Sequence, residues 1–351
     1  MLAYLHIPFC DSKCHYCAFN SYVDKFDLKD NYMLAINQQL AYELEKFDVK
    51  PKSITSLFIG GGTPSTIKAD LFAPFFETIK PFLSDDAEIT TEANPNSATK
   101  EWIQGMYQLG INRISFGVQS FNADKLKFLG RNHSKKAAIQ AIENASNIGI
   151  KNISLDLIYG SFADTPELLA HDLAIASKLP INHLSAYALT IEENTPFFTK
   201  TKVTNSSEKL AKMFVQRIIE AGFAQYEISN FGTYQSRHNK GYWEHDDYIG
   251  IGSGAVGFLK DKRFYPPKDV KTYIGNPLVC EIENLTPEDL HVEQIFLGLR
   301  SMIGIALSIF SPKERQRVDL LIEEKKLTCT AQRVYNNDYF LSDEIALFIT
   351  D

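Results

Sequence analysis

The sequence predicts an α/β protein: a partial, TIM-like (β/α)6 barrel followed by a small C-terminal α/β domain of winged-helix-like character. Two observations support this prediction. Strand-like and helix-like segments alternate through residues 2–221, a pattern typical of a parallel sheet with crossover helices. The length of 351 residues allows one large domain and a smaller one. We therefore expect a core over residues 1–259, a linker over 260–284 and a C-terminal domain over 285–351.

The first half of the chain carries six predicted strand–helix repeats. Between residues 28 and 47, Tyr32, Ile36, Leu40 and Leu44 recur at the spacing of one helix face. Asp70 is expected to cap the next helix. We predict strands at 2–5, 56–59, 88–92, 112–119, 152–158 and 183–189, and helices at 28–47, 70–82, 100–109, 135–148, 165–179 and 206–221. In such barrels the functional side chains gather at the C-terminal ends of the strands.

The second half gives weaker signals. Residues 226–258 are rich in aromatic residues and glycine and show no clear period, and residues 260–284 read as a linker. Thr286 and Pro287 mark a helix start, since threonine caps helices and proline fits the first helical position. That helix is expected to reach about Met302, and short helix and strand signals alternate beyond it.

Composition limits the classes of function. A net charge of -7 argues against a general nucleic-acid binder, because phosphate neutralisation needs a basic face. No apolar run is long enough to span a membrane. The chain begins with strand-like residues and not with a signal peptide, so we expect a cytoplasmic protein. Cys280 and Cys329 stand alone in the sequence and read as structural or inert.

Three cysteines follow the first strand at CxxxCxxC spacing: Cys10, Cys14 and Cys17. One loop can bring three thiolates to an iron–sulfur cluster, and three ligands to four irons leave one iron open for chemistry. Two alternatives to an iron–sulfur cluster remain open. Zinc would need a fourth ligand, which His6 or His15 could supply. Disulfides would need an even number of thiols in a secreted chain.

Polar and glycine residues mark the ends of the following strands. The run Gly60-Gly61-Gly62-Thr63-Pro64 lets the backbone approach a ligand closely. Glu92 ends the third strand, where a carboxylate could accept from ribose hydroxyls or an ammonium. Gln119 and Asp156 lie near the ends of the fourth and fifth strands, with Arg131 in the loop between them. Each feature alone is common in tight turns and solvated strand ends. Together they favour a nucleotide-like cofactor, which weakens the zinc reading.

With the cysteines, these motifs resemble the radical S-adenosylmethionine (SAM) superfamily. Four of them resemble, more narrowly, the oxygen-independent coproporphyrinogen III oxidase family, and the resemblance covers nearly the whole chain. They are Tyr4-Leu5-His6-Ile7-Pro8-Phe9-Cys10, Gly60-Gly61-Gly62-Thr63-Pro64, Gly117-Val118-Gln119-Ser120-Phe121 and Asp156-Leu157-Ile158-Tyr159-Gly160.

The resemblance implies a role for each matching residue. Cys10, Cys14 and Cys17 would ligate a [4Fe–4S] cluster, whose open iron would chelate SAM. Reduction of the cluster, by a donor such as a flavodoxin or ferredoxin, would cleave SAM to a 5′-deoxyadenosyl radical. Tyr4, Gly61 and Glu92 match positions that contact this cofactor. A second copy would be held, as in the oxidase, by Tyr16, Gly62, Thr63, Gln119, Arg131 and Asp156.

Two departures from the oxidase pattern indicate a branch of the family. The oxidase has a further cysteine two places after the third cluster cysteine, where this chain has Phe19. The oxidase also has an N-terminal arm before its first strand, which we expect to be absent here. Both features resemble the shorter relatives described as heme chaperones, the HemW type. The resemblance implies a protein that binds heme as cargo and delivers it to heme-accepting proteins.

The segment Arg237–Trp243 agrees with this branch, since it fits the HNxxYW pattern of those chaperones. A histidine can ligate heme iron and aromatic rings can cover a macrocycle, so His238, Tyr242 and Trp243 are the candidate heme residues. The structural alternative is that His238 and Trp243 pack this segment against the barrel.

The predicted function is therefore a heme chaperone on a radical SAM core, resembling coproporphyrinogen dehydrogenase but lacking that activity. The alternatives are a true coproporphyrinogen III oxidase, which decarboxylates its substrate oxidatively in porphyrin biosynthesis, or another radical SAM tetrapyrrole enzyme. A homodimer and peripheral membrane association through partners are further expectations from the resemblance.

Overall fold

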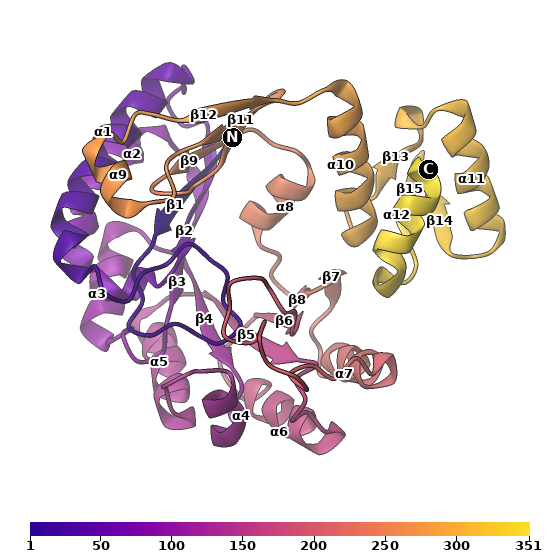
Figure 1. Ribbon diagram of the computed structural model, residues 1–351, viewed down its shortest axis with the longest axis horizontal. Helices are drawn as coiled ribbons and strands as arrows, with labels where there is room; N and C mark the ends of the chain where they lie inside the picture. The colour runs from indigo at the N-terminus through magenta and orange to yellow at the C-terminus, as the bar shows by residue number, and fades with distance from the viewer.

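Six parallel strands in sequence order frame the larger part of the protein in the computed structural model, which describes residues 1–351. Each strand pairs in register with the next, for example Leu5 with Ile59 and Ile59 with Thr91. Helices cover the outer face of this sheet (Figure 1). The strands are β1 (Leu2–Ile7), β2 (Ile54–Gly61), β3 (Leu83–Ala93), β4 (Arg113–Gln119), β5 (Asn152–Tyr159) and β6 (His183–Ala188).

Several of the helices on the outer face begin at the side-chain caps expected of crossover helices. Thr99, Ser134, Thr165 and Ser207 each accept a hydrogen bond from a first-turn backbone N–H. The helices are α1 (Lys29–Lys46), α2 (Ala73–Ile79), α3 (Lys100–Leu109), α4 (Ala123–Phe128), α5 (Lys135–Ile148), α6 (Pro166–Ala176) and α7 (Glu208–Glu220). Helix α4 was not predicted.

The prediction of one helix over 70–82 was wrong. Asp70 lies inside a 3-10 turn, α2 starts after Phe72 without a side-chain cap, and a second 3-10 turn follows it. Pro74 and Pro81 explain the break, because proline lacks the N–H that a continuous helix would use.

Alternation along the strands separates two faces. Ile59, Ile114 and Leu155 belong to the main hydrophobic core with the helices. Their neighbours Ser115 and Ser154 point to the opposite, inner face, where they are buried polar residues. The inner face of the barrel is therefore polar and available for a ligand.

The sheet continues beyond both ends of the six-strand frame. Strand β9 (Tyr248–Ile251) runs parallel to β1, followed by antiparallel β10 (Gly257–Leu259), β11 (Lys262–Tyr265) and β12 (Glu281–Asn284). At the other end β8 (Asn230–Gly232) and β7 (Gln225–Glu227) pair antiparallel next to β6.

The expectation that residues 260–284 form a linker was wrong. They contain β11, α9 (Val270–Gly275) and β12. Val270 and Tyr273 are fully buried in the main core. The two strands give little sequence signal because each is only four residues long and carries charged side chains, and β12 forms the edge of the sheet.

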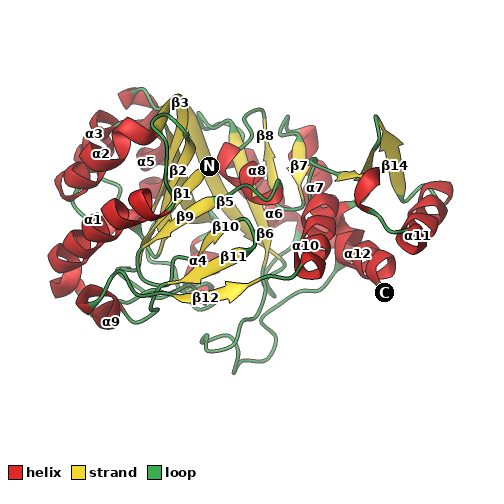
Figure 2. Ribbon diagram, turned by 90° about the horizontal axis from the view of Figure 1, so that it is seen from above, coloured by secondary structure: helices red, strands yellow, loops and turns green.

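The C-terminal residues build their own core. Helices α10 (Pro287–Arg300), α11 (Pro312–Glu323) and α12 (Ser342–Thr350) pack on a three-stranded antiparallel sheet of β13 (Ile305–Ala306), β14 (Leu327–Thr330) and β15 (Arg333–Asn336). As predicted, α10 begins at Thr286, which forms a capping box with Asp289. The unit lies at one end of the molecule (Figure 2). It is attached by a hydrogen bond from Met302 N–H to the Tyr226 carbonyl (2.9 Å).

Candidate cluster and cofactor site

The loop after β1 carries the three cysteines and is tied to the barrel at several points. Pro8 and Cys10 exchange backbone hydrogen bonds with Tyr22 (2.7 and 3.0 Å), which closes the loop on itself. His15 N–H donates to the Leu129 carbonyl and the His15 carbonyl accepts from Phe197 N–H, both at 3.0 Å. These bonds hold the loop over the C-terminal ends of the strands.

Cys10, Cys14 and Cys17 all line one cavity of about 920 Å³. None forms a disulfide. Thr63 Oγ1 donates to Cys10 Sγ (3.4 Å) and Arg131 Nη1 donates to Cys14 Sγ (3.3 Å). Burial raises the pKa of Cys10 and of Cys17, so a bound metal cluster would have to displace protons from thiols.

The donor set fits an iron–sulfur cluster better than a single ion. No three His, Cys, Asp or Glu side chains converge on a single-ion site, whereas the ligands of a cluster sit on different irons. Both imidazole nitrogens of His6 are already engaged, with Tyr4 Oη (2.9 Å) and the Asn20 carbonyl (2.8 Å). His15 uses Nδ1 on the Phe128 carbonyl (2.8 Å). Of the two histidines that could supply a fourth zinc ligand, His6 therefore has no free ring nitrogen, and His15 has only Nε2 left.

The glycine run after β2 supplies close backbone approach. Gly61 has φ +111°, and a Cβ there would lie 2.5 Å from the His6 ring. A Cβ on Gly62 would lie 2.9 Å from two backbone oxygens and 3.1 Å from Cys10 Sγ. Only glycine fits at both positions, and so the backbone itself forms the cavity wall beside the cysteines.

Two carboxylates face the cavity with strongly perturbed acidity. Burial, reinforced by the charge of Asp156, raises the pKa of Glu92 to about 7. Burial raises the pKa of Asp156 to about 6. Glu92 accepts from Gly61 N–H (3.0 Å) and Asp156 from Ser115 Oγ (3.2 Å). A cationic ligand would restore their charge, since an opposite charge favours the ionised form.

Gln119 and Arg131 approach from the next strand end. Gln119 has φ +65°, a conformation that costs a non-glycine residue energy and often marks a functional site. Its Oε1 is buried without a hydrogen-bond partner. Arg131 donates to the Gly117 carbonyl and to Cys14 Sγ. Both side chains line the cavity beside the cysteines.

The structure brings almost all the residues predicted for cluster and cofactor into this one cavity. Tyr4 does not line it but faces a neighbouring one. Those that line it are Cys10, Cys14, Cys17, Tyr16, Gly61, Gly62, Thr63, Glu92, Gln119, Arg131 and Asp156. The cofactor roles themselves stay predictions.

Comparison with known proteins places the chain in a family. Residues 4–174 match the radical SAM superfamily. The heme chaperone HemW of Bacillus subtilis is 35% identical over 90% of this chain and 88% of its own length. The heme chaperone HemW of Haemophilus influenzae is 34% identical over 99% of this chain and 97% of its own length. The chain belongs to the HemW family. The predicted resemblance is thereby confirmed.

The fold class of this HemW-family chain is confirmed by a solved structure. Coproporphyrinogen III oxidase (HemN) from Escherichia coli superposes with a TM-score of 0.82, at 19% identity, over 99% of this chain and 89% of that chain. This similarity shows a shared fold. No helix of the HemW-family chain is both long enough and apolar enough to cross a membrane.

Sequence reasoning missed part of the cavity wall of the HemW-family chain. Tyr187 lies at the end of β6, where the barrel rule would have found it. Arg300 and Phe340 come from the C-terminal unit. No motif marks these two residues, because only the docking of that unit brings them to the barrel.

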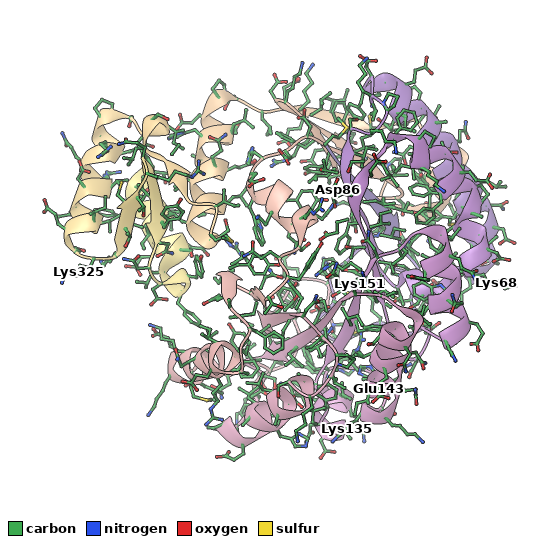
Figure 3. All side chains as sticks on the ribbon, turned by 180° about the vertical axis from the view of Figure 1, so that it is seen from behind. Lys68, Asp86, Lys135, Glu143, Lys151 and Lys325 are labelled. Atoms are coloured by element: carbon green, nitrogen blue, oxygen red, sulfur yellow. The ribbon has the colours of Figure 1, made fainter.

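The HNxxYW segment forms the short helix α8 (Arg237–Trp243), which lies in the opening of the barrel between the sheet and α10 (Figure 1). Glu88 of β3 accepts from the backbone N–H groups of Arg237 (2.9 Å) and His238 (3.1 Å). Arg237 also pairs with Asp86 at 3.0 Å (Asp86 is labelled in Figure 3). These contacts fasten α8 to the inner side of the sheet.

His238 is buried, and only one of its two ring nitrogens is hydrogen-bonded. Its Nδ1 is hydrogen-bonded to Ser56 Oγ (2.8 Å), whereas Nε2 has no partner. Burial lowers the pKa of His238 to about 3, so the imidazole is neutral and Nε2 can act as a metal ligand. Tyr242 packs edge-on against this ring with a centroid distance of 4.6 Å, while Trp243 packs on Tyr226. The packing alternative for this segment therefore describes the observed state.

Proposed function

We propose that this HemW-family chain binds heme and delivers it to acceptor proteins, on a core that holds a [4Fe–4S] cluster and SAM. The observation that carries the proposal is the similarity to curated heme chaperones over nearly the full length of both chains. The partnerless, neutral Nε2 of His238 supports it from the structure.

Cluster and cofactor would occupy the larger cavity. Cys10, Cys14 and Cys17 would hold the cluster. The carboxylate of Glu92 would accept a hydrogen bond from the ammonium group of SAM. Together these groups supply one-electron cleavage of a sulfonium; the protein binds, orients and shields them. Arg131 donates a hydrogen bond to Cys14 Sγ and would help to orient this sulfur toward the cluster. The remaining cavity residues would contact SAM, in one copy or two.

Heme ligation at His238 would need a local movement. The residue is 1% exposed and Tyr242 covers its ring. Rotation of Tyr242 would uncover Nε2 without breaking the hydrogen bonds that Glu88 accepts from α8. Trp243 would stay packed on Tyr226 and support the helix from behind.

The proposal includes a set of partners. Heme-accepting proteins would receive the cargo, and a flavodoxin or ferredoxin would supply electrons to the cluster. A homodimer, a cytoplasmic location and membrane association through partners complete the proposal.

Heme titration followed by absorbance tests the function. We expect about one heme per chain, with binding reduced strongly in His238→Ala and unchanged in the control His171→Ala, whose side chain is 54% exposed on α6. Thermal unfolding of each variant checks that the fold persists. Absence of heme binding in the wild-type protein would refute the proposed function.

A second candidate function is the oxidation of coproporphyrinogen III. It is favoured by the fold shared with the oxidase and by a cavity that already contains the predicted cluster and cofactor residues. Anaerobic incubation of reconstituted protein with SAM, reductant and coproporphyrinogen III separates the two functions. Formation of protoporphyrinogen would establish the oxidase; unchanged substrate beside bound heme supports the chaperone.

A further inference from the structure

The short helix α4 ends against the cysteine loop. The last carbonyls of a helix have no partner within it and need donors from elsewhere. At the end of α4, His15 of the cysteine loop supplies two such donors. Its Nδ1–H donates to the Phe128 carbonyl (2.8 Å), and its backbone N–H donates to the Leu129 carbonyl (3.0 Å). One residue of the loop therefore satisfies the open end of the helix.

The contact between this helix end and His15 is close. Gly130 follows the helix with φ +75°, and a Cβ there would lie 2.9 Å from the His15 ring. A residue with a side chain would push the two segments apart, whereas glycine allows both the conformation and the approach.

Helix α4 is itself fixed to the barrel. Lys125 Nζ donates to the Ile158 carbonyl (2.5 Å) at the end of β5 and pairs with Asp164 (2.6 Å). The side chains of Lys125 and Asp164 have no exposed surface, so water does not compete for these contacts. Ile158 also lines the larger cavity. The end of α4 is thus a fixed support beside the strand ends that form the candidate site.

The His15 ring is held from a second side by Phe197. The two rings pack with centroids 5.5 Å apart, and Phe197 N–H donates to the His15 carbonyl (3.0 Å). Phe197 is 1% exposed and belongs to a small core with Leu129 and Ile158. The backbone, the ring and the Nδ1 of His15 are therefore all engaged by the protein itself.

These contacts act on two of the three cysteines. His15 lies between Cys14 and Cys17, whose backbones form a turn in which Cys17 N–H donates to the Cys14 carbonyl (3.2 Å). Arg131, which follows the same helix end, donates to Cys14 Sγ (3.3 Å). Cys10 is held separately, from the β2 side of the loop. Ligands that are fixed in advance lose less conformational freedom when they bind.

We infer that His15 is a positioning residue for the cluster. The hydrogen bond from its Nδ1–H to the Phe128 carbonyl holds Cys14 and Cys17 in the arrangement that binds iron. The inference rests on the proposed function, because it concerns the cluster that the proposal places on this loop. It assigns His15 to the support of the ligands and not to the ligand set. Removing a group that orients metal ligands typically lowers metal affinity by about 10–100-fold.

The rate of cluster loss to a chelator tests this role. Anaerobically reconstituted wild type, His15→Leu and His15→Asn are mixed with excess iron chelator, and the decay of the cluster absorbance is followed. His15→Leu retains an apolar contact with Phe197 but no donor, and we expect it to lose the cluster about tenfold faster than wild type. His15→Asn retains an N–H near the position of Nδ1 and should restore most of the wild-type lifetime.

The order of the two variants separates positioning from packing. If His15 only filled space, leucine would replace the ring better than asparagine, and His15→Asn would lose the cluster faster. His171→Leu, at a half-exposed histidine on α6, is the matched control and should behave as wild type. Thermal unfolding of the cluster-free variants checks that each is folded.

Electron paramagnetic resonance of the reduced cluster gives a second readout, because it reports on the geometry of the ligands. We expect a changed spectrum in His15→Leu and the wild-type spectrum in His15→Asn. Wild-type cluster lifetime in His15→Leu would overturn the inference, as would a lifetime in His15→Asn no longer than in His15→Leu. Failure of the wild type to take up iron and sulfide would instead refute the cluster of the proposed function.

Discussion

Replacing the buried carboxylate of Glu92 by an amide should stabilise the cofactor-free protein, and more so as the pH rises. Glu92→Gln keeps a side-chain oxygen that can accept from Gly61 N–H (3.0 Å in the wild type) and removes the charge. The pKa of Glu92 is about 7 in the folded chain, against an ordinary value of 4.5. The folded state therefore holds the proton more tightly, and ionisation opposes folding.

The magnitude follows from the two pKa values. They differ by about 2.5, and each pKa unit corresponds to about 1.4 kcal/mol, which gives an upper limit of about 3.5 kcal/mol. Water in the cavity screens part of this, and we expect about 2 kcal/mol. Because the folded pKa is raised, wild-type stability falls as the pH rises from about 4.5 to about 7 and is constant above it. The variant lacks this contribution.

Urea unfolding of the apo proteins at pH 5, 6, 7 and 8, under reducing conditions, provides the assay. We expect the free energy of unfolding of Glu92→Gln relative to wild type to rise by about 2 kcal/mol between pH 5 and pH 8. Glu143→Gln, at an exposed carboxylate within α5, serves as a control and should leave the pH dependence unchanged. A difference that does not change with pH would refute the assignment of a destabilising charge at Glu92.

Three further changes give distinct outcomes. Gly61→Ala should destabilise the chain by about 2 kcal/mol or more, because its Cβ would lie 2.5 Å from the His6 ring and the backbone has φ +111°. Urea unfolding measures this, and an unchanged free energy of unfolding would contradict the packing described. Lys125→Met removes the partner of buried Asp164 (2.6 Å) and should cost about 3–5 kcal/mol, seen as a lower melting temperature; an unchanged melting temperature would mean that the pair contributes little. Cys17→Ser should lower iron and sulfide content after reconstitution without changing the far-ultraviolet circular dichroism, and full iron loading would remove Cys17 from the ligand set.

The sequence predicted the frame of the barrel well because its signals were local. Apolar runs predicted all six strands of the frame, and helix caps predicted helix starts between them. The order of the strands followed from this alternation. The failures have a common cause in tertiary context. Tyr273 makes residues 260–284 part of the core through contacts with a distant helix, and nothing in that stretch shows a period.

The candidate site was predictable to the extent that barrel geometry gathers strand ends. Because both end strands of the barrel, Glu92 and Asp156 line the same cavity as the three cysteines. Tyr4 does not line that cavity, because its hydroxyl is hydrogen-bonded to His6 and its side chain lines the neighbouring cavity. His238 carried the right motif, yet its burial under Tyr242 depends on α8 folding into the barrel, which short-range sequence signals do not encode.

One anaerobic measurement tests the central claim most directly. Reconstituted, heme-loaded protein is incubated with SAM, a reductant and coproporphyrinogen III, and the tetrapyrroles are then separated and quantified. A heme chaperone retains about one heme per chain and leaves coproporphyrinogen unchanged. Accumulation of protoporphyrinogen would contradict that account and assign the chain to the oxidase reaction.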